Sequence, residues 1–112
     1  MEAKSDITAI FCANDNTAIG AIKAIREKGY RIPEDISIIG VDDIETSQYI
    51  SPMLTTVHIP MEEMGQLAAK ILIDRINGGH RIPLKTLLPF YIAKRDTCAK
   101  PSKNGKTFLN MP

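Results

Sequence analysis

The sequence predicts an α/β fold built around a parallel sheet, and three observations support this class. Short runs that are apolar at nearly every position, as buried strands are, alternate with longer stretches whose apolar residues recur at helical spacing. Turn-forming residues separate these runs. The length of 112 residues fits one domain with a single core.

The first elements form a predicted strand–helix–strand unit. Residues 7–13 (ITAIFCA) read as a buried strand, and residues 15–28 as a helix that ends before Gly29. The apolar positions of this helix are Ala18, Ala21, Ile22 and Ile25. Residues 36–41 (ISIIGV) read as a second buried strand. Two such strands joined by a helix are parallel, with a right-handed crossover.

The second half of the chain is predicted to add two strands and a helix. Residues 54–59 (LTTVHI) read as a strand, and Pro60 opens a helix with acidic residues in its first turn. The apolar stripe of this helix is expected to face a core, and comprises Met61, Met64, Leu67, Ala68, Ile71, Leu72 and Ile76. Residues 87–93 (LLPFYIA) read as a final strand, where Pro89 indicates an edge or irregular position. The domain is expected to span residues 7–97, with a poorly ordered tail at 98–112.

Composition and motifs exclude several classes of function. The balance of 14 basic and 13 acidic residues gives a net charge of +1, too small to draw the chain onto DNA or an anionic membrane. The two cysteines make neither a zinc signature nor a disulfide framework, and the first residues lack a signal-peptide pattern, so we expect a cytoplasmic setting. No nucleophile elbow or phosphate-binding glycine loop occurs. We therefore expect no catalytic site, no metal and no cofactor.

Polar residues follow the first two predicted strands. Asn14 and Asp15 come after the first strand, and Asp42 and Asp43 come after the second. Ligands of open parallel sheets bind beyond the carboxyl ends of the strands, so Asn14 and Asp42 should line one crevice. An amide beside a carboxylate suits the hydroxyl groups of a sugar or nucleoside.

Other interpretations of these residues remain open. Asn14 and Asp15 could cap the helix that follows them, and Asp43 could cap the segment that follows it in the same way. Asp42 could be an acidic loop residue. Asp15, Asp42 and Asp43 could together hold Mg²⁺, as in receiver-type proteins. His58 stands alone in a strand without a second metal ligand, which favours a structural role.

The segment from Cys12 to Ile76 resembles the effector-binding domain of LacI/GalR-type transcriptional regulators. The resemblance rests on CANDNTAIGA, GYRIPEDISIIGVDD and PMLTTV, which occur in order and at the family's spacing, and it continues to Lys94-Arg95-Asp96. It implies a type I periplasmic-binding-protein-like fold, in which two α/β lobes close on a small ligand, and of which this chain is the later part.

The resemblance also implies roles for particular residues. Asn14 matches a position whose amide commonly contacts the effector, and Asp42 matches a carboxylate that binds the effector's hydroxyls or ring nitrogen. Ile59 and Met61 depart from the polar or aromatic contacts of some relatives, so the identity of the effector stays open. A homodimer or larger homo-oligomer is implied, through positions Asn16, Ile19, Ile22, Lys23, Gln48 and Tyr49. The alternative is that Ile22 is a core residue and Tyr49 a loop aromatic.

The implied function is sensing rather than catalysis. The chain is expected to be the effector-binding and dimerisation part of a bacterial transcriptional regulator, a repressor, whose ligand is a sugar or related small metabolite. No DNA-binding headpiece, hinge helix or first lobe is found in these residues, so operator DNA would be bound only through a headpiece outside them. A periplasmic sugar-binding protein of a transporter is the alternative.

Overall fold

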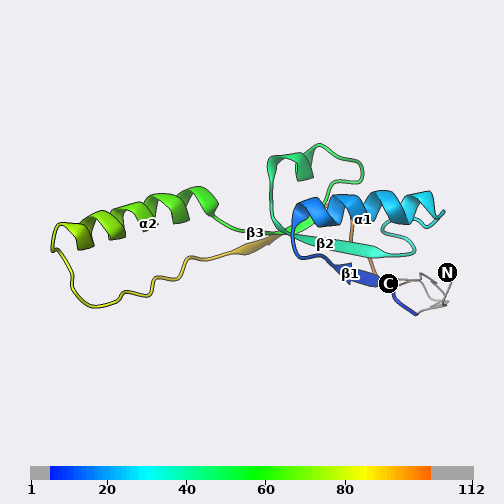
Figure 1. The fold of residues 1–112 in the computed structure, drawn as a ribbon. Coiled ribbons are helices and arrows are strands. Elements are labelled where there is room, and N and C mark those ends of the chain that lie inside the picture. Colours follow the sequence, from blue (N-terminus) through cyan, green and yellow to red (C-terminus); the bar gives the residue numbers. More distant parts are fainter. Residues whose placement is uncertain (1–5, 102–112) are drawn as a thin grey trace.

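A four-stranded sheet with one helix packed on it forms the body of the protein, and a second helix is carried away from it (Figure 1). The computed structural model describes residues 6–101. In chain order the elements are β1 (Ala9–Phe11), α1 (Asp15–Glu27), β2 (Ser37–Asp42), the 3₁₀ helix η1 (Glu45–Gln48), β3 (Thr55–His58), α2 (Met61–Ile76) and β4 (Tyr91–Ala93).

The sheet has the strand order β1-β2-β3-β4, and its first three strands are parallel. This confirms the α/β class and the parallel strand–helix–strand unit. β4 pairs with β3 in the antiparallel direction and lies at the edge. It begins only at Tyr91, two residues after Pro89, because proline cannot donate a hydrogen bond to a strand ladder.

The hydrophobic core lies between α1 and the sheet. Its buried members are Cys12, Ala18, Ile22, Ile25, Ile36, Ile38 and Leu54. Three of the apolar positions predicted for α1 are therefore buried, as expected from their helical spacing. The helix ends where Gly29 adopts a φ of +89°, a conformation that residues with a Cβ rarely adopt.

The apolar stripe of α2 does not face the core, and this expectation is wrong. No residue of α2 is buried, and Figure 1 shows α2 and the extended segment after it reaching away from the sheet. We call residues 60–90 the arm. A helix that joins parallel strands must lie over the sheet, but α2 precedes a strand that returns antiparallel beside β3, so no crossover holds it there.

The stripe instead lies along an open groove within the arm. The groove has a volume of about 530 Å³, and its apolar lining comes from Met64, Leu67, Ala68, Ile71, Leu72, Pro83, Leu84 and Leu88. Neither helix of the described residues is long and apolar enough to cross a membrane.

The end of the predicted domain, Thr97, and the start of the predicted tail, at Ala99, are held against β2. The Thr97 hydroxyl donates a hydrogen bond to the carbonyl of Ile38 (2.6 Å), and the amide of Ala99 donates to Ser37 Oγ (3.0 Å). Residues 102–112, which make up most of that tail, lie outside the described residues.

Candidate functional site

Asn14 and Asp42 lie at the same edge of the sheet. Asn14 follows β1 by three residues, and Asp42 is the last residue of β2. β1 and β2 are neighbouring parallel strands, with Phe11 beside Ile39, so their carboxyl ends open on a common edge. That edge is where parallel sheets place their ligands.

Asn14 caps helix α1. Its Oδ1 accepts a hydrogen bond from the amide of Thr17 at 2.8 Å. The capping interpretation of Asn14 is therefore confirmed. Its Nδ2 makes no hydrogen bond to another described residue, so the side chain retains a donor at the sheet edge while its acceptor is engaged.

Asp42 and Asp43 have an unusual backbone conformation. Their φ angles are +119° and +61°, a region that residues with a Cβ occupy at a cost in free energy. Two consecutive strained residues at a strand end are typical of functional sites, where the surrounding structure maintains the strain.

A hollow of about 280 Å³ opens beside Asp42, where the sheet meets the arm. It is bordered by Asp42, Asp43, Ile44, His58, Ile59, Pro60, Met61, Glu62 and Glu63. Asn14 is not among these residues. The structure thus brings Asn14 and Asp42 to one edge, while the hollow itself is built on the Asp42 side.

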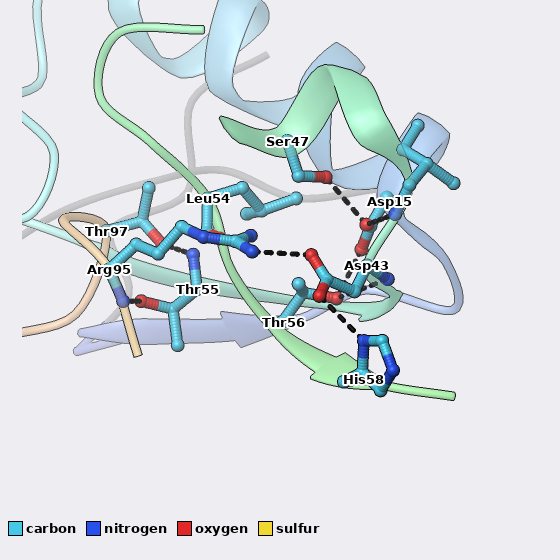
Figure 2. A network of polar contacts seen from close by, with 10 residues as sticks. Asp15, Asp43, Ser47, Leu54, Thr55, Thr56, His58, Arg95 and Thr97 are labelled. Atoms are coloured by element: carbon cyan, nitrogen blue, oxygen red, sulfur yellow. Dashed lines mark hydrogen bonds and ion pairs between the residues drawn. The ribbon is translucent and has the colours of Figure 1, made fainter. Parts of the chain in front are cut away.

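Asp15 is fully buried and organises the loop that follows β2 (Figure 2). Its Oδ2 accepts hydrogen bonds from the Ile44 amide (2.9 Å) and the Ser47 hydroxyl (2.6 Å), and its Oδ1 accepts one from Thr56 Oγ1 (2.5 Å). Asp15 does not cap α1, because Asn14 holds that position, and its side chain is closed to solvent. No group of three potential metal-ligating side chains occurs in the described part of the chain.

Asp43 joins the ends of two other strands (Figure 2). Its Oδ1 lies 2.6 Å from Arg95 Nη2, and its Oδ2 lies 2.8 Å from His58 Nδ1. Burial raises the pKa of Asp43, but the hydrogen bonds from His58 and Arg95 outweigh it and hold the pKa below its ordinary value. Asp43 is therefore an ionised partner of Arg95 rather than a cap.

His58 has the structural role that the sequence favoured. Besides its contact with Asp43, its ring stacks on Tyr91, with ring centroids 4.5 Å apart. Sequence reasoning did not identify Arg95 as a functional residue. Its only signal was its place in the Lys94-Arg95-Asp96 element of the family resemblance.

The residues expected at a dimer face fall into two groups. Asn16, Lys23, Gln48 and Tyr49 are exposed, Tyr49 by 75%, and Ile19 is half-buried. Ile22 is only 6% exposed and belongs to the core cluster, in line with its alternative interpretation. Between α1 and the segment after η1 is a hollow of about 510 Å³, lined by Ile19, Ile22, Lys23, Arg26, Glu27, Ile50 and Ser51.

Comparison with known families defines the class of protein. Residues 2–98 match the family model described as a periplasmic binding protein-like domain. Because this match covers most of the chain, the chain belongs to the family of periplasmic-binding-protein-like domains, as its α/β architecture indicates.

Individual relatives narrow the assignment to LacI/GalR-type regulators. The chain is 51% identical over 76 residues to the HTH-type transcriptional repressor PurR of Vibrio atlanticus, a match that covers 68% of the chain and 23% of that repressor. It superposes on a LacI family transcriptional regulator from Enterococcus faecium with bound ribose (TM-score 0.81, 42% identity), which covers 88% of this chain and 37% of that one. A dimeric Lac repressor with an 11-residue C-terminal deletion gives a TM-score of 0.78 and 38% identity, and covers 85% of this chain and 35% of that one.

These similarities confirm the resemblance to the effector-binding domain of LacI/GalR-type regulators. The three proteins are named as repressors or regulators, not as enzymes. The chain spans 23% of the curated relative's length and about a third of each solved chain.

Proposed function

We propose that this chain is the effector-sensing and dimerisation part of a cytoplasmic LacI-type repressor that binds a sugar or related small metabolite. No bond is made or broken. The effector binds one closure state of two lobes better than the other, and this difference in affinity biases a DNA-binding headpiece that is not among these residues.

The strained carboxylate at the sheet edge is the observation that carries this proposal. Asp42 holds a left-handed backbone beside a hollow of about 280 Å³. A carboxylate accepts hydrogen bonds, and the Asn14 Nδ2 donates them, so together they complement hydroxyl groups, which do both. The ribose-bound regulator from Enterococcus faecium supports a sugar as the class of ligand.

The arm supports a two-lobed arrangement. An open groove lined by apolar side chains is incomplete by itself, and the arm reaches beyond the edge where Asn14 and Asp42 lie. We assign the arm to the second lobe, so that the hollow beside Asp42 lies between the lobes. This differs from the expectation that no part of another lobe is present.

The outer side of α1 and the segment after η1 are the proposed dimer face. Tyr49 is exposed on this side, and Ile19 lines the adjacent hollow. Exposed aromatic residues beside an apolar hollow are typical of interfaces. The matched Lac repressor is described as dimeric.

A thermal-shift screen against monosaccharides, disaccharides and nucleobases tests the proposed site. At least one compound should raise the melting temperature of the chain, and Asp42→Ala should abolish the increase. Asn14→Ser keeps a helix-capping oxygen but removes the amide donor, so it should weaken the increase without the stability loss of Asn14→Ala. Glu34→Ala, an exposed acid before β2, is the control and should leave the increase unchanged. Stabilisation that survives both site variants would contradict the proposal.

A further inference from the structure

Two neighbouring strands form the connection between the arm and the sheet (Figure 1). β3 leads into α2, and β4 leads back from the arm, with His58 paired to Tyr91 where both strands reach the arm. The direction of the arm is therefore set by whatever fixes these two strands relative to the rest of the sheet.

Asp43 contacts both β3 and the segment after β4, although it lies at the end of a third strand, β2. It follows β2, and it bonds His58 at the end of β3 and Arg95 two residues after β4. Figure 2 shows its carboxylate between these two side chains. The side chain of Asp43 is only 7% exposed, so water competes little for its two bonds.

Both partners of Asp43 are themselves held. Arg95 Nη1 donates to the Leu54 carbonyl at 2.9 Å, and the Arg95 amide donates to Thr55 Oγ1 at 2.9 Å, at the start of β3. At the far end of β3, the His58 ring stacks on Tyr91 of β4. The contacts of Asp43 and of its two partners thus include both ends of β3, at Thr55 and His58, and the first residue of β4, Tyr91.

The conformation of Asp43 is also tied to Asp42. The Asp43 amide donates to Thr56 Oγ1 (3.3 Å), whose hydroxyl donates to buried Asp15. These contacts hold a residue with a positive φ, and the preceding residue, Asp42, shares this strained turn. We therefore expect a change at Asp43 to affect the backbone turn that carries Asp42 as well as the arm.

We propose that Asp43 is a positioning residue that clamps the two arm connections to the end of β2. The Asp43–Arg95–His58 network holds the arm in one orientation relative to the sheet when no effector is bound. That this orientation is one of two closure states rests on the proposed function. Removing the carboxylate leaves the Arg95 guanidinium, whose side chain is 15% exposed, without its charged partner, which is costly in a largely buried position.

A distance measurement between spin labels tests the clamp. Labels are attached at Ala24→Cys on the exposed side of α1 and at Lys70→Cys on α2, with Cys12 and Cys98 replaced by alanine. Dilution with unlabelled chain removes distances between copies. The parent should give one narrow distance distribution, and Asp43→Ala should lose the narrow peak while its circular dichroism still shows a folded chain.

Two further variants keep the test decisive. His58→Phe retains an aromatic ring to stack on Tyr91 but loses the contact with Asp43, so it should also broaden the distance distribution. If Asp43→Ala does not fold, the His58→Phe distribution alone tests the clamp. Asp35→Ala removes a surface ion pair with Arg31, whose side chain is 69% exposed, and should leave the distribution narrow. Folded Asp43→Ala or His58→Phe variants with the parent's narrow peak would overturn the clamp.

This measurement contains no ligand, so it separates the clamp from the proposed function. A narrow parent distribution that broadens in Asp43→Ala supports the clamp even if D-ribose and the rest of the screen fail to stabilise the chain. That failure would count against the effector site alone.

Discussion

Replacing Asp15 by alanine should be among the most destabilising single substitutions in the body of the protein. The fully buried carboxylate accepts three hydrogen bonds, from Ile44, Ser47 and Thr56. Hydrogen bonds to a charged group contribute about 1.5 to 3 kcal/mol each. We take the lower value because the two hydroxyls can rotate toward other acceptors, so the expected loss for the three hydrogen bonds is about 4.5 kcal/mol.

Urea unfolding followed by circular dichroism measures this loss from the shift in midpoint at constant slope. Asp15→Asn should cost roughly half as much as alanine, because its carbonyl can accept from Ile44 while its amide donates to the Thr56 hydroxyl. Asp74→Ala, at an acid whose side chain is 57% exposed, should cost less than about 1 kcal/mol. A loss for Asp15→Ala as small as that of the Asp74 control would refute the central role of this carboxylate.

The remaining predictions concern packing, acid sensitivity and assembly. Gly40→Ala should destabilise by about 1 to 3 kcal/mol, because its Cβ would collide with the Asp15 carboxylate, whereas Gly20→Ala, with open space around it in α1, should be neutral or stabilising; equal urea midpoints would contradict this. The pKa of Asp43 in the folded chain lies below its ordinary value of 3.8. Its contribution to the free energy of unfolding is therefore complete above pH 3.8 and is lost as the pH falls through the lowered pKa. Urea midpoints of Asp43→Asn should therefore depend less on acid than those of the parent, and parallel profiles would refute the assignment. Tyr49→Glu should shift the chain from dimer to monomer in light scattering after size exclusion, while Tyr49→Phe should not; a dimer that survives Tyr49→Glu would remove this residue from the interface.

Local signals in the sequence located α1 closely. The observed helix, Asp15–Glu27, starts after Asn14 and stops before Gly29, because capping and helix termination depend on residues next to the helix end. The strands lie where their apolar runs predict them. β1, β3 and β4 are shorter than those runs, whereas β2 (Ser37–Asp42) has the expected length and is shifted by one residue from 36–41. The first run spans residues 7–13, whereas β1 spans Ala9–Phe11, since pairing with β2, rather than apolar character, sets a strand's length.

The arm shows what periodicity does not reveal. The stripe on α2 correctly indicates an amphipathic helix, but its spacing says nothing about which surface covers it. The decisive fact is that β4 returns antiparallel beside β3, and strand direction is a property of the whole sheet. An apolar stripe alone therefore predicted the wrong neighbour.

The position of the candidate site could be predicted from the sequence, but the hydrogen bonds and ion pairs within it could not. Asn14 and Asp42 follow strands that sequence alone marks as parallel, so their common edge could be expected. Asp43 and Arg95 are far apart in the chain, and nothing local connects them. The burial of Asp15 likewise depends on Ser47 and Thr56, which come from separate segments.

The most direct test of the account is an amide chemical-shift titration of the isotope-labelled chain with the same sugars and nucleobases. A binding compound should produce saturable shifts at the carboxyl edge of β1 and β2, around Asn14 and Asp42, and these shifts should disappear in Asp42→Ala. Saturable shifts confined to the opposite edge of the sheet, or no response to any compound, would contradict the claim that this edge holds a small polar effector.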